Sequence, residues 1–465
     1  MKVDLSRGAA IAALLCLAVG LVAPFSGVPA AGQRALGIAL FAIICWTAQP
    51  VPLELSSLVA LLLLPAAGLL TLRQSLDAFA GPTVWLVFAG MVLSHAVSRA
   101  QLGRAAVARL MRHLTGGRFR LLASLHLLGL ASSLIIPSAV VRVLLLLPLG
   151  EAVIERLVGG RDPTTRTAVL LSLVCSTYYG GCGVLTGTVP NLVVVGQLEA
   201  VSGEVMYWSE WLVWMFPIIG LARTGLSLAV IWALYGRHLP PQGPTMSPPR
   251  AEPLGGDQTR VLVILGLGVA LWSTDAAHHL APVYVGLLLV VLCILPRWGP
   301  LSLAQLRQVN FPFFFYLAAL FAIGDALEAA GVSQKVLSTA WSWATGTAWF
   351  SAGEGSWLAR HLAVTALVVP LDFLMDIAAA AAVATPTMLE LAGSQGMSPM
   401  GTAMCVAMAT TLVFLPYQSA PFMVALREGQ LRLGQLVICM LIISALSLIV
   451  LCPLNIVFWR YLGLI

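Results

Sequence analysis

One stretch of the sequence interrupts a long apolar segment with residues that a membrane helix rarely tolerates. Between the helix-length runs 165–177 and 192–200, residues 178–191 contain four glycines, two threonines, a proline and an asparagine. Backbone groups released from helical bonding are tolerated at membrane depth only where protein or a watery cavity satisfies them. Interrupted helices of this kind place half-helix ends around a substrate or an ion. The stretch therefore predicts a binding site near the centre of a membrane protein.

The composition places the chain in a membrane. Of its 465 residues, 59% are hydrophobic and 9% are charged, and the mean hydropathy is +0.95. Many apolar runs approach the roughly 20 residues that span a bilayer. We expect an all-α polytopic membrane protein of the bacterial inner membrane, with about eleven transmembrane helices plus two re-entrant hairpins. The basic residues behind the net charge of +6 lie in short loops, so no nucleic-acid partner is expected.

A proline- and glycine-rich segment, residues 237–259, divides the chain into two halves that follow one plan. Residues 1–33 precede this plan and are interpreted as a retained first transmembrane helix rather than a cleaved signal. An odd number of spans in each half, 34–236 and 260–465, gives the halves opposite orientations, which is the inverted-repeat plan of secondary transporters. A cytoplasmic amino terminus puts most of the 25 Lys and Arg residues on the cytoplasmic side.

Each half is predicted to contain one re-entrant hairpin followed by one broken helix. Basic residues flank both ends of the first long apolar segment, so both ends belong in the cytoplasm and residues 137–140 form the tip. Interfacial helices are expected before the hairpins, at 101–114 and 333–345. The hairpins and broken helices are predicted at 119–157 and 165–200 in the first half and at 357–392 and 400–427 in the second.

Two motifs resemble the divalent-anion/sodium symporters, a family that carries citrate, succinate, malate and sulfate. Residues 45–58 are similar to the early Trp-x-Thr-Glu-x-x-Pro-Leu segment of that family. Residues 180–191 resemble its Gly-Gly-x-x-x-x-x-Gly-Thr-Pro-Pro-Asn loop, with Val189 in place of the first proline. The resemblance implies two hairpins and two broken helices around a small anionic substrate and sodium ions. It also implies an elevator movement of this unit against a homodimeric scaffold in the lipid bilayer.

The candidate site residues come from the first hairpin tip and from the two helix breaks. Their hydroxyl, amide and guanidinium groups have no helical reason to lie there, and the prolines mark the breaks. The predicted substrate-binding residues are Ser138, Arg142, Thr186, Thr188, Pro190, Asn191, Tyr417, Gln418, Ser419 and Pro421.

Both hairpin tips depart from the Ser-Asn-Thr that the family carries there. The first tip reads Pro-Ser-Ala-Val-Val-Arg over 137–142, and the second reads Asp-Ile-Ala over 376–378. Oxygen ligands that a hard cation requires are thus lost from both tips. The loss argues against sodium coupling, although one sodium ion near Ser138, Gly187 and Asn191 stays open. No other cofactor is expected.

Two arginines and two aspartates carry charge into apolar segments. Arg142 is a functional candidate because an ionised arginine at membrane depth is costly, and its planar guanidinium suits a carboxylate. An ion pair or snorkelling is the alternative for Arg142 and the preferred interpretation of Arg223. Asp376 and Asp372, four residues apart, would share a helical face, and Asp376 is the candidate for proton coupling. The alternatives for Asp376 are an ion pair with Arg142 or a solvated external mouth.

The leading interpretation is a secondary active transporter of small di- or tricarboxylates or other divalent anions. The alternative is a sodium-independent exchanger or a proton-coupled carrier of another organic anion. An enzyme is not expected, because HExxH and GxSxG motifs are absent from the sequence. A channel is disfavoured because two inverted broken helices suit alternating access.

Overall fold

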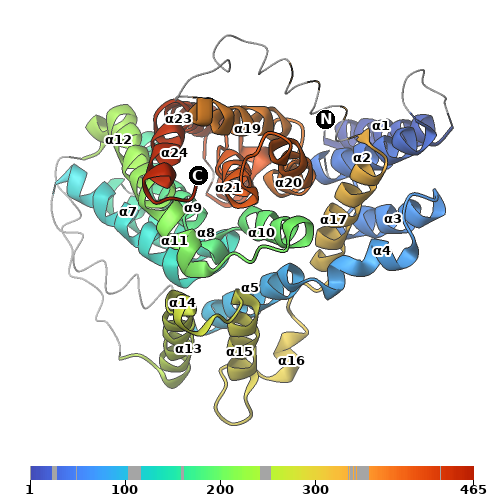
Figure 1. The fold of residues 1–465 in the computed structure, drawn as a ribbon. Coiled ribbons are helices and arrows are strands. Elements are labelled where there is room, and N and C mark those ends of the chain that lie inside the picture. Colours follow the sequence, from blue (N-terminus) through green and yellow to red (C-terminus); the bar gives the residue numbers. More distant parts are fainter. Residues whose placement is uncertain are drawn as a thin grey trace.

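The computed structural model consists of helices and the loops that join them (Figure 1). All the regular elements among the described residues are helical, so the all-α class is confirmed for this part of the chain. The described residues are 2–22, 29–48, 50–102, 117–158, 162–240, 253–332, 356–429 and 431–465, together with 335, 339 and 342.

The first half contains the elements expected around the first break. The interval predicted as a hairpin holds two helices separated by residues 136–138, and the interval predicted as a broken helix holds two helices separated by a single 3₁₀ turn. Most of the predicted interfacial helix at 101–114 lies outside the described residues. The elements are α1 (Lys2–Val22), α2 (Ala30–Ala48), α3 (Leu53–Ala66), α4 (Leu72–Leu76), η1 (Asp77–Ala80), α5 (Pro82–Arg99), α7 (Arg118–Ile135), α8 (Ala139–Val158), α9 (Pro163–Cys182), η2 (Leu185–Gly187), α10 (Val189–Ser202), α11 (Trp208–Met215), η3 (Phe216–Ala222), α12 (Arg223–Tyr235) and η4 (Gly236–His238).

The second half repeats this order of elements. Most of the predicted interfacial stretch at 333–345 and much of the predicted linker lie outside the described residues. The elements are α13 (Gly256–Ser273), α14 (Asp275–His278), α15 (Pro282–Ile294), α16 (Leu303–Leu306), α17 (Phe313–Ala329), α19 (Ser356–Asp372), α20 (Ile377–Gly393), α21 (Pro399–Thr410), η5 (Pro416–Gln418), α22 (Ala420–Glu428), α23 (Leu433–Leu446), η6 (Ser447–Leu451) and α24 (Cys452–Tyr461).

Corresponding elements of the two halves exchange packing partners. α15 packs on α5, and α17 packs on α3. α7 lies along α9 as α19 lies along α21, while α8 contacts α22 and α20 contacts α10. The last helix of each half contains a π-helical segment, η3 or η6, and a proline accompanies each: Pro217 within η3 and Pro453 just after η6. Proline lacks the N–H that an α-helical bond needs, which favours such irregular turns.

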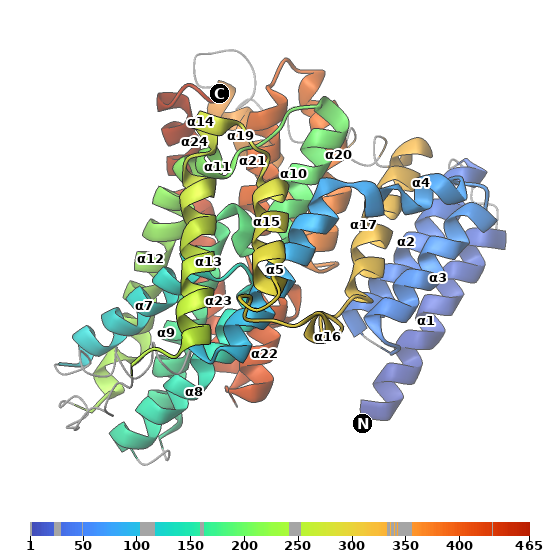
Figure 2. The same cartoon turned by 90° about the horizontal axis from the view of Figure 1, so that it is seen from below.

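The helices form an inner bundle and an outer group. Figures 1 and 2 show α1 to α4 and α17 set to one side of the bundle that contains α7 to α12 and α19 to α24. In Figure 2, α8 lies toward the bottom of the view, whereas α19 and α20 lie toward the top. Large apolar side chains remain exposed on the outside, such as Leu62 at 56%, Leu127 at 65% and Ile449 at 71%. Such a surface suits a lipid environment.

The predicted count of transmembrane helices is not reproduced by helix length and composition. Three helical segments among the described residues are long and apolar enough to cross a membrane: 118–135, 208–238 and 433–461. A fourth arises if α4, η1 and α5, which bend by 49°, are taken as one span. The other apolar helices are shorter, because breaks divide them. One of the three, α7, is an arm of the predicted hairpin.

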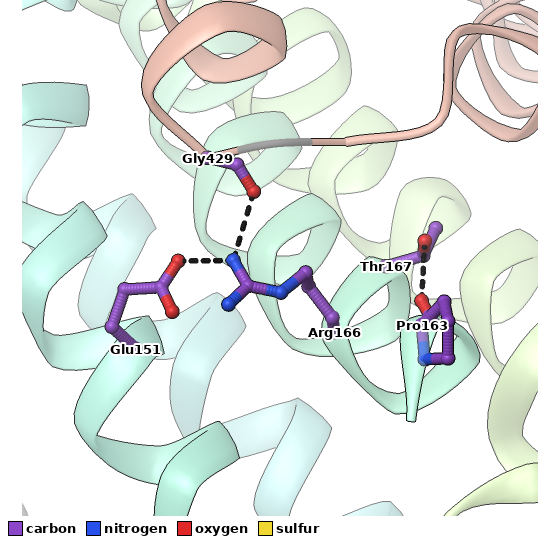
Figure 3. A network of polar contacts seen from close by, with 5 residues as sticks. All are labelled: Glu151, Pro163, Arg166, Thr167 and Gly429. Carbon is purple, nitrogen blue, oxygen red and sulfur yellow. Dashed lines mark hydrogen bonds and ion pairs between the residues drawn. The ribbon is translucent and has the colours of Figure 1, made fainter. Parts of the chain in front are cut away.

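A polar network on one side of the bundle joins the two halves (Figure 3). Asp162 caps the first turn of α9 by accepting bonds from the N–H groups of Thr164 and Thr165. From that turn Arg166 forms an ion pair with Glu151 of α8 and donates to the carbonyl oxygen of Gly429, just after α22, at 3.0 Å. The network fixes the start of α9 and leaves its far end to form the break.

Candidate functional site

The two helix breaks share a local motif. Each contains one 3₁₀ turn with an extended residue on either side, and the second extended residue leads into the next helix; two residues, 183–184, precede the turn in the first break and five, 411–415, in the second. The first extended residues are Val184 (φ −118°, ψ 125°) and Leu415 (φ −128°, ψ 144°). The second are Thr188 (φ −145°, ψ 150°) and Ser419 (φ −145°, ψ 122°). The breaks are therefore equivalent in conformation as well as in sequence order.

Aromatic contacts place the two breaks side by side. The ring of Phe422, in the first turn of α22, lies 4.9 Å from that of Tyr178 and 6.4 Å from that of Tyr179, measured between centroids. All three side chains are buried. None of the three is among the residues predicted for the site, because aromatic residues in an apolar helix look like ordinary core.

Close approach of the backbone to itself explains two of the glycines. A Cβ on Gly187 would lie 2.3 Å from the carbonyl oxygen of Gly181. A Cβ on Gly181 would lie 2.1 Å from Nη2 of Arg142. Only glycine fits at these two positions, so the first break folds back onto the end of α9.

Arg142 locks the tip of the first hairpin to the first break. Its side chain is fully buried at 0% exposure. Nε donates to the Thr177 hydroxyl at 3.0 Å, and Nη2 donates to the carbonyl oxygens of Thr177 at 3.1 Å and Gly187 at 3.0 Å. Nη1 donates to the carbonyl oxygen of Ile136, at the tip. One guanidinium thus joins the hairpin tip, the end of α9 and η2.

These bonds occupy four of the five N–H groups of the guanidinium. A two-point grip on a carboxylate needs two N–H groups on one edge. Contact of Arg142 with substrate therefore stays a prediction, and it would require at least one of the acceptors to be released.

Several groups around Gly187 that a sodium ion would use are engaged within the chain. The Gly187 carbonyl oxygen already accepts from a cationic donor, and a second cation beside that guanidinium would be repelled. The Ser138 hydroxyl oxygen accepts from the N–H of Val141 at 3.4 Å, at the start of α8. The Asn191 amide donates to the carbonyl oxygen of Val184 at 2.9 Å. The Gly187 and Ser138 oxygens are thus engaged by donors of the chain, whereas Oδ1 of Asn191 is not, and sodium binding here stays a prediction.

The remaining predicted residues of the first break line its second half. The Thr186 hydroxyl accepts from Nε1 of Trp208 at 3.3 Å. Thr188 precedes α10 without a capping bond from its side chain, and Pro190 lies in the first turn. Asn191 is fully buried, and its Oδ1 has no hydrogen-bond partner among the described residues. The break therefore offers one buried acceptor and an uncapped helix start.

The predicted residues of the second break bind the tip of the second hairpin. Gln418 is fully buried; its Oε1 accepts from the N–H groups of Phe414 and Leu415, and its Nε2 donates to the carbonyl oxygen of Asp372 at 2.7 Å. Tyr417, 37% exposed, donates to the carbonyl oxygen of Phe373 at 2.7 Å.

Ser419 and Pro421 begin α22, again without a side-chain cap. Neither helix that follows a break therefore has a side-chain cap, although the N–H of Phe422 in the first turn of α22 donates to the carbonyl oxygen of Ser419 at 3.1 Å.

Arg223 stands at the second break as Arg142 stands at the first. Its Nη1 donates to the Thr411 hydroxyl at 2.6 Å and to the Thr411 carbonyl oxygen at 3.3 Å, and its guanidinium lies 5.9 Å from the centroid of the Tyr179 ring. The expectation of snorkelling is wrong, because Arg223 is fully buried. Thr411 is the C-cap of α21, so each broken helix has a guanidinium at its negative, carbonyl end.

Asp372 and Asp376 do not share a helical face. α19 ends at Asp372 and the chain turns through 373–375, so the stretch is not one continuous helix, and the shared face that depended on such a helix does not form. Asp376 is the N-cap of α20: its Oδ1 accepts from the N–H groups of Ala378 at 2.9 Å and Ala379 at 3.3 Å, and from the Tyr316 hydroxyl at 2.7 Å. Capping competes with helix continuation for aspartate, which explains the turn.

A small, partly open pocket lies beside the first break, between η2, α10, α5 and α15. Its lining is largely apolar and includes Leu86, Leu185, Leu192 and Val283, with Glu199 as its one charged residue. An apolar cavity with a carboxylate does not suit a dianion, so the breaks remain the better candidate site.

Comparison with known proteins identifies the family. A family model described as a citrate transporter matches residues 40–407. The chain belongs to the citrate transporter family. This confirms that it is a membrane transporter, not an enzyme, and that it is related to the dicarboxylate and citrate carriers.

Relatives of this citrate transporter family member are distant in sequence. A transporter of Haemophilus influenzae is 22% identical over 441 residues, which cover 91% of each chain. The sodium-dependent dicarboxylate transporter SdcS of Staphylococcus aureus is 26% identical over 267 residues, 53% of this chain and 50% of SdcS. The crystal structure of the Alcanivorax borkumensis YdaH transporter has a similar fold, with a TM-score of 0.55 at 14% identity over 84% of this chain and 88% of that one.

The Asn191 amide gives a testable prediction for this family member. Asn191→Ala removes the bond to the Val184 carbonyl oxygen and the open acceptor Oδ1, so we expect uptake to fall at least about tenfold, as loss of one buried hydrogen bond implies. Folding should persist, measured as a monodisperse peak in size-exclusion chromatography. Thr188→Ala is expected to act in the same direction. Wild-type uptake kinetics in both variants would remove this break from the site.

Proposed function

We propose that this chain is a secondary active transporter of small di- and tricarboxylates that does not depend on sodium. The single observation that carries the proposal is the pair of equivalent breaks lying side by side, each followed by a helix with an uncapped start. Helix N-termini bind anions through their free N–H groups and positive dipole ends. Two such ends, one at each break, suit a substrate with two carboxylates. The names of the relatives, dicarboxylate transporters among them, support this substrate class.

Sodium independence rests on the two buried guanidiniums. In a sodium-coupled carrier, the ion supplies positive charge and binds carbonyl oxygens at the break. Here Arg142 donates to the Gly187 carbonyl oxygen, and Arg223 donates to the Thr411 carbonyl oxygen. A fixed cation at each carbonyl end compensates the substrate charge without an ion that moves. What remains is exchange or coupling to protons, which includes the alternative of a carrier for another organic anion.

We propose an elevator movement of the inner bundle, α7 to α12 and α19 to α24, against the outer helices. A run of five alanines, 378–382, begins α20, which packs on α17. Small side chains give a smooth surface that favours sliding. We further propose a homodimeric scaffold in the bacterial inner membrane with a cytoplasmic amino terminus, as the family resemblance and the distribution of basic residues imply.

The test is counterflow in proteoliposomes that contain the purified protein. Vesicles loaded with unlabelled succinate, and parallel vesicles loaded with citrate, are diluted into the same labelled acid. We expect transient accumulation of label, at the same rate when sodium is replaced by choline at fixed pH. Protein-free vesicles are the control for leakage.

The outcomes separate the parts of the proposal. Accumulation that falls to background without sodium would restore ordinary sodium symport. No counterflow of any carboxylate or divalent anion, with or without sodium, would overturn the substrate class.

A further inference from the structure

Asp372 is a buried carboxylic acid that the fold leaves without a partner. The last residue of α19, it has an exposure of 0%. Neither of its carboxylate oxygens has a hydrogen-bond partner among the described residues. The ion pairs in that part of the chain join Arg166 to Glu151 and Arg260 to Asp257, and neither involves Asp372. Burying an ionised carboxylate without compensation is far more costly than burying the neutral acid.

Among the described residues, the groups packed around α19 place no compensating cation beside Asp372. Asp376, at the start of α20, adds a negative charge nearby, and Cys405 is the titratable group of α21. Arg460 of α24 lies over Trp357, about four turns away at the opposite end of α19, where His361 also lies. The remaining titratable groups at this tip are the hydroxyls of two tyrosines: Tyr417 of η5 donates to Phe373, and Tyr316 of α17 donates to Asp376. The neutral acid is therefore the stable form of Asp372 in this packing.

The position of Asp372 couples it to the candidate site. Its carbonyl oxygen accepts from Gln418, and that of Phe373 accepts from Tyr417, so two bonds fasten the tip of the second hairpin to the second break. Phe373 and Leu374, the next residues, are 41% and 65% exposed. When the tip leaves the break, the two bonds separate and the carboxyl group is one residue from the surface.

We propose that the Asp372 carboxyl group is the proton-binding site of this transporter. It holds a proton while the second tip is packed on the break, and it releases the proton to water as the carboxylate when the tip separates. Asp376 is not this site, because its carboxylate already accepts three hydrogen bonds as a helix cap. The inference rests on the proposed carboxylate transport. A proton gradient then drives accumulation, and protonated Asp372 adds no negative charge to the site that holds the dianion.

The test measures the ratio of steady-state accumulation of labelled succinate with and without an inward proton gradient, in proteoliposomes free of sodium. For one coupled proton, a gradient of one pH unit should raise wild-type accumulation up to about tenfold. We expect this ratio to fall to about one in Asp372→Asn, which keeps the shape but binds no proton. Asp376→Asn is the matched control, since asparagine is an equally good N-cap, and its ratio should stay like that of the wild type. An unchanged ratio in Asp372→Asn would overturn the proposal.

A second measurement does not depend on transport. Infrared spectroscopy of the purified, reconstituted protein detects the carbonyl stretch of a protonated carboxylic acid. We expect a band at neutral pH that is present in the wild type and in Asp376→Asn and absent in Asp372→Asn, with size-exclusion chromatography confirming that each variant folds. The same band in Asp372→Asn would assign the protonated acid to another residue, and no band in the wild type would mean that Asp372 is ionised; either result would overturn the proposal. If no substrate is transported, the proposed function fails and this spectrum still decides the proton site. If transport occurs with a wild-type ratio of about one, the proton site alone fails.

Discussion

Gly187→Ala is expected to abolish transport. The added Cβ would lie 2.3 Å from the carbonyl oxygen of Gly181 and 2.9 Å from the Gly181 Cα, so it meets backbone that no rotamer change can move. Either the break opens or the end of α9 shifts, and both would displace the carbonyl oxygen that Arg142 binds at 3.0 Å. Overpacking of this kind costs about 1–3 kcal/mol of stability, which a drop in the thermal unfolding temperature in detergent would report.

The matched control is Gly225→Ala in α12. No atom lies within 4 Å of the Cβ that would be added there. Alanine stabilises a helix interior relative to glycine by about 0.5–1 kcal/mol, so the unfolding temperature should stay or rise slightly. We expect Gly225→Ala to transport like the wild type. Full activity of Gly187→Ala would show that the break tolerates a rearranged backbone, and would remove its geometry from the argument for the site.

The positions of the breaks could be predicted from sequence because glycine and proline act locally. Residues 178–191 cannot continue a helix, and the same reasoning found the tips and the second break. Span length could not be predicted in this way. The run 433–459 is largely apolar, and nothing in its composition indicates the π-helical turn at Ser447–Leu451 except the proline that follows. The count of membrane crossings depends on how the helices pack and how they are oriented in the membrane, and the apolar runs of a sequence determine neither.

The candidate site could be predicted in residue type but not in partners. Arg142 stands out in sequence because a charge in an apolar segment is costly, yet its acceptors lie on Thr177 and Gly187, far along the chain. For Arg223 the sequence favours an ion pair or snorkelling, and it offers no adjacent acid as a partner. Its acceptor is Thr411, 188 residues away. The partial negative charge at the carbonyl end of a helix can stabilise an arginine, but a sequence does not show which helix end lies beside it. The pairing of the two aspartates failed for the opposite reason, since a local cap overrode the helical spacing.

Substitution of Arg142 is expected to have the second large effect. Arg142→Gln removes the charge and leaves the buried oxygens of Thr177, Ile136 and Gly187 without their donor. Each buried acceptor left without a donor costs about 1–3 kcal/mol, so the tip should detach from the break. We expect binding of labelled succinate and its uptake to fall to background. Arg142→Lys separates charge from geometry, because one ammonium group keeps the charge but cannot span acceptors on three segments.

If function requires Arg142 to join the three segments, uptake by Arg142→Lys should fall by about tenfold or more. The reason is the loss of at least one charged hydrogen bond worth about 1.5–3 kcal/mol. Wild-type uptake in Arg142→Lys would mean that charge alone is required, and wild-type uptake in Arg142→Gln would remove the guanidinium from the site altogether.

The control is Arg166→Gln. That arginine also joins two elements, through Glu151 and the carbonyl oxygen of Gly429, but it lies at the start of α9, its side chain is 21% exposed, and it contacts neither break. Because exposed ion pairs contribute little, Arg166→Gln should bind and transport succinate like the wild type. If only the Arg142 variants lose uptake, the loss is caused by the change at the break and not by removal of an arginine from the bundle.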